Sequence, residues 1–170
     1  NGLTLKSPFA GGLNLPQLSK ADIDLDGLLD IVAFDRSGNR LLVFRNEGTA
    51  GNPDYRHAPA LEAGFPKSLI NFCLMRDYNC DGKADIFTWQ FSGLQVFKNT
   101  STPGQVSFVL ADTLITTDNG LGPVPLYVAF DDIPAIEDVD GDGDMDILTF
   151  DGGGSYVEFH RNTSVELLGT

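Results

Sequence analysis

The chain has 170 residues, of which 24 are acidic and 11 are lysine or arginine, so its formal net charge is −13. This length suits one domain, since domains commonly span roughly 100–200 residues. Hydrophobic residues make up 42% of the chain, enough for a packed core. No apolar run of about 18 residues occurs that would cross a membrane. The negative charge argues against nucleic acid, whose phosphates are bound by lysine and arginine. We therefore expect a globular chain with no nucleic-acid partner and no membrane insertion.

Half of the acidic residues lie in three segments that share the pattern D-x-[DN]-x-D-G-x-x-D. The segments are residues 22–30, 77–85 and 138–146, and their starts are 55 and 61 residues apart. One pattern recurring at nearly constant spacing indicates an internal repeat, in which each unit folds in the same way.

Each acidic segment is followed by the same series of elements. An apolar run comes first (30–34, 85–89 and 146–150), and a glycine-bearing turn follows it. A second apolar segment then ends with an aromatic residue and an asparagine, as V-F-R-N at 43–46, V-F-K-N at 96–99 and F-H-R-N at 159–162. Short runs rich in β-branched and aromatic residues, bounded by Gly, Asn and Asp, predict strands. A fourth strand is expected at 55–61 in the first unit and at 106–114 in the second. No long stretch has the helical period.

The predicted fold is therefore all-β, built from units of four antiparallel strands. About four strands in each repeated unit is typical of a β-propeller blade. We place the units at 14–64, 65–117 and 124–170 of a single domain, 1–170, with 1–13 as the outer strand of a preceding blade. Propellers usually contain about 4–8 blades. Because the chain also begins without Met, we expect a piece of a larger propeller or, alternatively, a partial ring that self-associates.

Carboxylates at alternate positions of one loop repel each other, and a divalent cation relieves that repulsion. Ca²⁺ accepts about 6–8 oxygen ligands in a flexible geometry, and glycine at position 6 permits the sharp turn around it. We therefore predict three Ca²⁺ sites, one in each acidic segment. The predicted ligands are the side chains of Asp22, Asp24, Asp26 and Asp30, of Asp77, Asn79, Asp81 and Asp85, and of Asp138, Asp140, Asp142 and Asp146, with the main-chain carbonyls of Leu28, Lys83 and Asp144.

The EF-hand has a similar acidic spacing, but it needs a carboxylate at loop position 12 and flanking helices. That position holds Ala33, Thr88 and Thr149 in the three segments. Strand-like residues follow each loop, so the sequence argues against an EF-hand.

The acidic loops, the D-I-[VLF] runs after them and the V-F-x-N segments resemble the FG-GAP/VCBS repeats of integrin α-subunit propellers and of many secreted bacterial proteins. The resemblance covers most of the chain. It implies a β-propeller that holds Ca²⁺ in the hairpin loop between the first two strands of a blade. The chain has no Phe-Gly or Gly-Ala-Pro element at the expected places, which argues against an integrin-like ligand site.

Cys73 and Cys80 flank the start of the second acidic segment. In an oxidising compartment we expect a short disulfide between them, whereas in a reducing one they would be a buried thiol and a loop thiol. Extracellular modules bind Ca²⁺ at about 10⁻⁴–10⁻³ M, so calcium and a disulfide both indicate a secreted or cell-surface protein. Asn99 and Asn162 begin N-x-[ST] triplets. Because Asn46 stands at the same place of the first unit without a triplet, a structural role in a turn is favoured over glycosylation.

We expect no enzymatic activity. No nucleophile, phosphate-loop or histidine-cluster motif occurs, and carboxylates held ionised by Ca²⁺ are poor general acids. The expected function is a calcium-stabilised extracellular β-propeller module that serves as a recognition or adhesion scaffold for a protein or glycan partner. Further blades would come from the same longer chain or from self-association. Two alternatives stay open, namely an accessory or catalytic segment of a secreted carbohydrate-active enzyme and a purely structural surface or filament protein.

Overall fold

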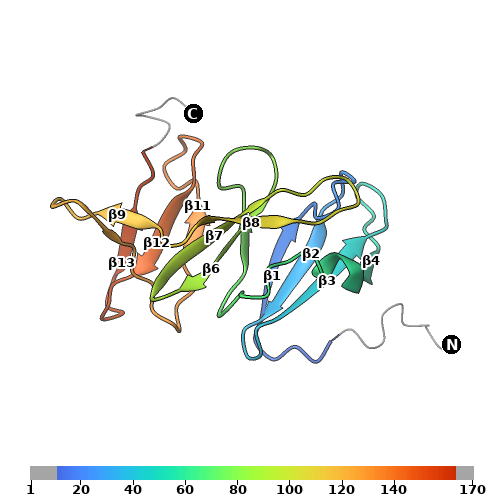
Figure 1. Ribbon diagram of the computed structural model, residues 1–170, viewed down its shortest axis with the longest axis horizontal. Helices are drawn as coiled ribbons and strands as arrows, with labels where there is room; N and C mark the ends of the chain where they lie inside the picture. The colour runs from blue at the N-terminus through green and yellow to red at the C-terminus, as the bar shows by residue number, and fades with distance from the viewer. Residues whose placement is uncertain (1–10, 164–170) are drawn as a thin grey trace.

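The structure, a computed structural model, describes residues 11–163 and is all-β (Figure 1). The first sheet contains β1 (Pro16–Ala21), β2 (Asp30–Asp35), β3 (Arg40–Asn46) and β4 (Tyr55–His57), all antiparallel and in chain order. The second contains β5 (Leu74–Arg76), β6 (Asp85–Gln90), β7 (Gly93–Asn99) and β8 (Phe108–Asp112). The third contains β11 (Ala135–Glu137), β12 (Asp146–Phe150) and β13 (Val157–His160). The predicted all-β fold with antiparallel four-stranded sheets is confirmed.

Two features of the connections were not predicted. The strand expected at 55–61 ends at His57, and helix α1 (Pro59–Glu62) follows it because proline has no N–H for a strand ladder and fits the first turn of a helix. Strands β9 (Thr116–Asp118) and β10 (Pro123–Pro125) form a separate hairpin between the second and third sheets in the chain. At four residues, α1 is far too short to cross a bilayer, and residues 11–163 contain no helix that could.

Figure 1 shows the three sheets side by side in chain order, and within residues 11–163 they do not close into a ring. Two clusters of buried apolar side chains lie between neighbouring sheets. Side chains alternate along a strand, so β6 contributes to both clusters: Ile86 packs with residues of the first sheet, and Phe87 packs with residues of the third. The second sheet therefore has an apolar partner on each face.

The predicted disulfide between Cys73 and Cys80 is not formed, because the two thiols lie on different sides of the second sheet. Cys73 is fully buried in the cluster between the first and second sheets. Cys80 is exposed and lines a cavity beside Phe87, which belongs to the other cluster. The sheet separates the two sulfurs.

Candidate metal centres

The three acidic segments form the loops between the first and second strands of their sheets. The last aspartate of each pattern, at loop position 9, is the first residue of the second strand and is 0% exposed. Each of these carboxylates accepts one N–H from loop position 2 and one from the asparagine at the end of the V-F-x-N segment. The distances are 2.9 and 2.7 Å for Asp30, 2.8 and 2.6 Å for Asp85, and 3.0 and 2.8 Å for Asp146.

Burial raises the pKa of Asp30 and Asp85, against the opposing effect of the backbone N–H groups that they accept. Neighbouring loop carboxylates raise the pKa of both groups further. A cation beside either carboxylate would favour its ionised form and would therefore lower its pKa again. The electrostatics of the loops therefore suit a bound cation.

The first aspartate of each pattern organises the turn. Asp22 accepts the N–H groups of Asp26 at 3.0 Å and Gly27 at 2.8 Å. Asp77 accepts the corresponding N–H groups of Asp81 and Gly82, whereas Asp138 accepts those of Gly141 and Gly143, at positions 4 and 6 of its loop. The glycine at position 6 has φ of +88°, +82° and +101° in the three loops, in the region that favours glycine. The sequence interpretation of position 6 as the turning point is confirmed.

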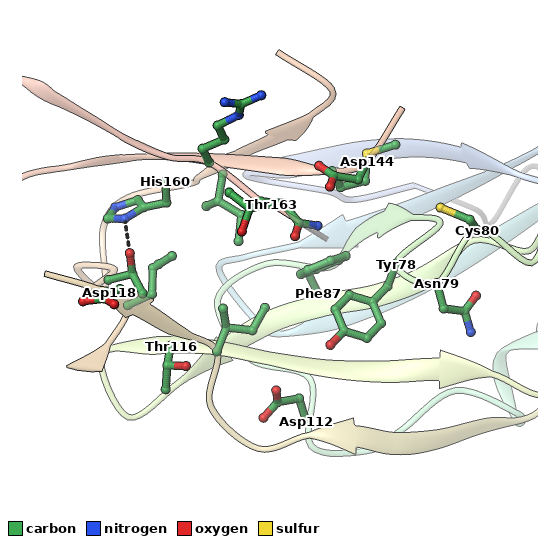
Figure 2. A pocket seen from close by; sticks show the side chains of 17 residues that line it. Tyr78, Asn79, Cys80, Phe87, Asp112, Thr116, Asp118, Asp144, His160 and Thr163 are labelled. Carbon is green, nitrogen blue, oxygen red and sulfur yellow. Dashed lines mark hydrogen bonds between the residues drawn. The ribbon is translucent and has the colours of Figure 1, made fainter. Parts of the chain in front are cut away.

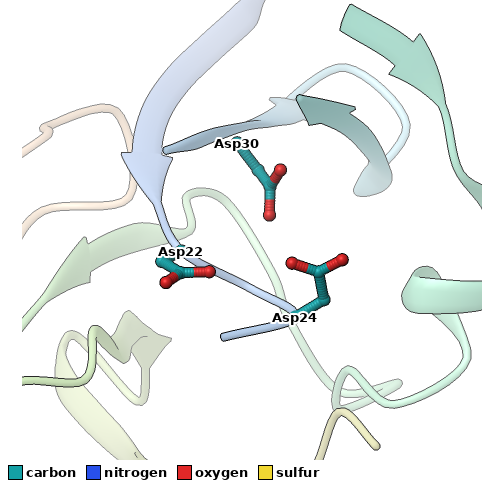
Figure 3. A group of neighbouring side chains, drawn as sticks. All are labelled: Asp22, Asp24 and Asp30. Carbon is teal, nitrogen blue, oxygen red and sulfur yellow. The ribbon is translucent and has the colours of Figure 1, made fainter. Parts of the chain in front are cut away.

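Three carboxylates converge in the first loop and three in the third. Figure 3 shows Asp22, Asp24 and Asp30 turned toward a common space, and their ligand atoms lie within 4.8 Å of one another. Asp138, Asp140 and Asp146 form an equivalent group. Oxygens that share one Ca²⁺ at about 2.4 Å lie no more than about 4.8 Å apart. The donor set and its spacing thus fit a calcium ion.

The second loop differs at position 3, where Asn79 stands in place of an aspartate. Its amide oxygen accepts the N–H of Asp81 at 3.2 Å. Asp77 and Asp85 keep the hydrogen bonds of their counterparts in the other loops. The second loop therefore keeps these hydrogen bonds but has one carboxylate fewer among its predicted side-chain ligands.

Two of the predicted side-chain ligands at position 5, Asp26 and Asp142, are not among the converging carboxylates. Asp26, Asp81 and Asp142 each accept the N–H of the position-7 residue at 2.9 to 3.0 Å. These bonds involve only the N–H groups of Leu28, Lys83 and Asp144. Ligation of Ca²⁺ by the carbonyl oxygens of the same residues stays a prediction.

One oxygen in the first loop stands out. Asp24 is 9% exposed, and its Oδ1 is buried with no hydrogen-bond partner among the described residues. Its other oxygen, Oδ2, lies 2.5 Å from Nε of Arg45. Buried oxygens without a partner are rare in folded proteins, and a bound ion is one established reason for them.

Sequence reasoning missed a basic residue that contacts each loop. Arg45 reaches Asp24 and, at 3.2 Å, Asp26. Lys98 reaches Asp81 at 3.4 Å, and Arg161 lies 2.5 Å from Asp140 and 3.7 Å from Asp142. All three residues stand directly before the asparagine that ends the segment (V-F-R-N, V-F-K-N and F-H-R-N), and their shared positive charge was the available signal.

A cavity of about 880 Å³ lies between the second and third sheets (Figure 2). Tyr78, Asp112 and Thr116 are on its walls, with His160 from β13. His160 pairs with Ile147 across the sheet, at the place where the other sheets have phenylalanine. Its two ring nitrogens lie 3.1 Å from the hydroxyls of Thr149 and Thr117, and burial lowers its pKa.

The chain was compared with protein-family models, with curated proteins and with solved structures, and none of them matches it.

Proposed function

We propose that the chain is a calcium-stabilised module of β-propeller type, with one Ca²⁺ in each acidic loop. The observation that carries this proposal is the convergence of Asp22, Asp24 and Asp30, together with the buried, unpartnered Oδ1 of Asp24. Each position-9 carboxylate also ties the loop to the end of the third strand or, at Asn162, to the segment just after it. Bound Ca²⁺ therefore links the first three strands of a sheet, and its binding energy adds to the stability of the fold.

Thermal unfolding of the full chain in Ca²⁺, in Mg²⁺ and in excess chelator tests this proposal. Each site adds about 2.7 kcal/mol at a Ca²⁺ concentration 100 times its dissociation constant. We expect Ca²⁺ to raise the melting temperature, chelator to lower it, and Mg²⁺ to restore little, since Mg²⁺ demands six ligands at shorter distances. Asp24→Asn should reduce the Ca²⁺ effect, whereas Asp131→Asn, at an exposed position outside the loops, should retain it. A melting temperature indifferent to Ca²⁺ would refute the proposal.

The propeller arrangement is supported by an exposed apolar face on the third sheet. Phe150, Val157 and Phe159 are 42%, 53% and 48% exposed. The strand pairing gives them the same places that Trp89, Leu94 and Val96 hold in the second sheet, where these side chains pack against the third. We propose that another sheet of the same kind covers this face, from further blades of the same chain or from a second copy.

Light scattering of the chain as it elutes from a size-exclusion column, over a range of chain concentrations, tests self-association. If copies stack through this face, the mass should rise with concentration, and Val157→Glu should keep the chain monomeric. A wild-type chain that stays monomeric throughout would exclude a second copy as the cover.

The biological role that we propose is a recognition or adhesion scaffold, secreted or on a cell surface, for a protein or glycan partner. Ca²⁺ near 10⁻³ M is an extracellular condition, and loops of modest affinity are filled there. Because the cysteines are free, this localisation rests on calcium alone.

One observation favours the alternative of a carbohydrate-active segment. The cavity between the second and third sheets has three aspartates on its walls, Asp112, Asp118 and the loop residue Asp144, beside Tyr78 and His160. Glycoside hydrolysis uses a carboxylate pair. A screen of the chain with aryl glycosides and oligosaccharides would show hydrolysis that Asp112→Asn abolishes if this alternative holds. The scaffold proposal expects no turnover.

A further inference from the structure

The basic residue that contacts each acidic loop stands next to the asparagine that anchors the same loop. Asn46 donates its N–H to Asp30 at 2.7 Å, while the preceding Arg45 reaches Asp24 and Asp26 with its guanidinium. The end of β3 thus holds the loop at two points, through the main chain at position 9 and through a side chain at positions 3 and 5.

The two oxygens of Asp24 have different surroundings. Oδ2 is 2.5 Å from Arg45, whereas Oδ1 is buried and has no partner among the described residues. The ion pair keeps Oδ2 of Asp24 beside the guanidinium and leaves Oδ1 available for a metal, while Arg45 also donates a hydrogen bond to Asp26. Arg45 also offsets part of the repulsion among the four carboxylates of the loop. This geometry is more consistent with a residue that positions the ligands than with a residue that takes the place of the ion.

The kind of basic residue matches the loop that it contacts. In the first and third loops, positions 3 and 5 are both aspartate, and an arginine spans them. In the second loop, position 3 is Asn79, and Lys98 contacts the single aspartate at position 5. Guanidinium groups bridge two acceptors, whereas an ammonium group acts as a point charge.

The balance of negative and positive charge also separates the second loop from the first and third. The first loop sets four carboxylates against one guanidinium, and the third sets five against one. The second loop has three carboxylates against two ammonium groups, because Lys83 stands at its position 7 and extends to the carbonyl of Ser101 at 3.0 Å. The second loop therefore attracts a divalent cation least.

We infer that Arg45, Lys98 and Arg161 are positioning residues for the metal, and that the first and third loops bind Ca²⁺ more tightly than the second. This inference rests on the proposed calcium function and adds to it the residues that orient the ligands and the order in which the loops fill. Each basic residue holds its carboxylates from one side, so that their remaining oxygens face the ion.

The test is a Ca²⁺ titration of the full chain followed by the backbone amide resonances of Gly27, Gly82 and Gly143. Each of these N–H groups donates to the position-1 carboxylate of its own loop, so each resonance reports one site. In the wild type, we expect Gly27 and Gly143 to reach their final shifts at lower Ca²⁺ than Gly82. If Gly82 saturates first, the inferred order is wrong.

The positioning role is tested by Arg45→Gln, with Arg40→Gln as its control. Arg40 lies on the same strand, is exposed, and contacts the carbonyl of Gly11, so its loss changes the net charge equally without touching the loop. Loss of a group that orients metal ligands typically weakens metal binding about 10–100-fold. We expect Arg45→Gln to weaken binding at the first loop by about tenfold or more, Arg45→Lys to weaken it less, and Arg40→Gln to leave it unchanged.

The outcomes separate this inference from the calcium proposal. If the wild type shows no Ca²⁺-dependent shifts, the calcium proposal fails, and this inference fails with it. If the wild type binds Ca²⁺ and Arg45→Gln binds equally well or more tightly, only the positioning role is overturned. Tighter binding would mark Arg45 as a competitor of the ion.

Discussion

The carboxylate of Asp85 and the main-chain N–H of Asn99 form a 2.6 Å hydrogen bond that joins the start of β6 to the end of β7. The side chain of Asn99 in turn donates to the carbonyl of Ala84 at 3.0 Å. Asp85 is 0% exposed and Asn99 is 1% exposed. Asn99 therefore has the structural role that the sequence pattern favoured, since its amide is buried and bonded in the folded chain.

Removal of the Asp85 carboxylate should destabilise the fold even without metal. Asp85→Ala leaves the buried N–H groups of Tyr78 and Asn99 without their acceptor, and each such loss costs about 1–3 kcal/mol. We expect the free energy of unfolding to fall by at least about 2 kcal/mol in urea titrations with chelator present. Asp131→Ala, at an exposed position, should change it by no more than about 0.5 kcal/mol. Equal effects of the two substitutions would contradict this account of Asp85.

The two cysteines should differ sharply in reactivity. Burial raises the pKa of the Cys73 thiol to about 12, whereas Cys80 is exposed. Thiolates are the reacting species, so a colorimetric thiol reagent should modify one cysteine in the native chain and two in urea. Cys80→Ser should leave no thiol that reacts in the native state. A native chain with no reactive thiol and a mass two hydrogens lower would show that the disulfide forms after all.

The backbone at loop position 4 is left-handed in all three loops, with φ of +60° at Leu25, +58° at Cys80 and +83° at Gly141. A residue with a Cβ pays roughly 1–2 kcal/mol in this conformation, and glycine does not. Glycine has greater freedom in the unfolded chain, which offsets about 0.5–1 kcal/mol of the gain. We therefore expect Cys80→Gly to raise the free energy of unfolding by up to about 1 kcal/mol, measured in urea.

Cys80→Ala is the control, because it removes the thiol and keeps the Cβ. It should leave the stability close to that of the wild type. If alanine stabilises the chain as much as glycine, the thiol is responsible and the backbone is not.

Lowering the pH should remove the contribution of Asp35 to the stability of the fold over a defined pH range. Its pKa is lowered to about 2, mainly by the N–H of Asn14 and the hydroxyl of Ser37, with further bonds from Leu15 and Ser37 N–H. A lowered pKa means that the stabilisation is present above the ordinary value of about 3.9 and is lost as the pH falls through about 2. With chelator present, the Asp35→Asn variant should have a lower melting temperature than the wild type at pH 5–7. The difference between the two melting temperatures should become smaller between pH 4 and pH 2. A difference that stays constant over this range would show that the charge of Asp35 is not involved.

Much of the fold was predictable because its signals are local. Alternation of side chains along a strand and a glycine with positive φ at position 6 depend on a few neighbouring residues. The sequence by itself determined the strands that follow the acidic loops, the place of each loop between the first two strands, and the turn at Gly27, Gly82 and Gly143. The asparagines that end the V-F-x-N segments were also recognised as structural from their recurrence.

Only the tertiary structure decided which side chains meet across strands and sheets. Arg45 lies 19 residues from Asp26 in the chain, and the pairing of β2 with β3 brings the two together. Cys73 and Cys80 are close in sequence, yet Cys73 is buried in the cluster between the first and second sheets, whereas Cys80 is exposed and lines the cavity between the second and third sheets. The cavity beside His160 likewise depends on how two sheets pack. Contacts of this kind follow from the order and register of strands, which no short stretch of sequence contains.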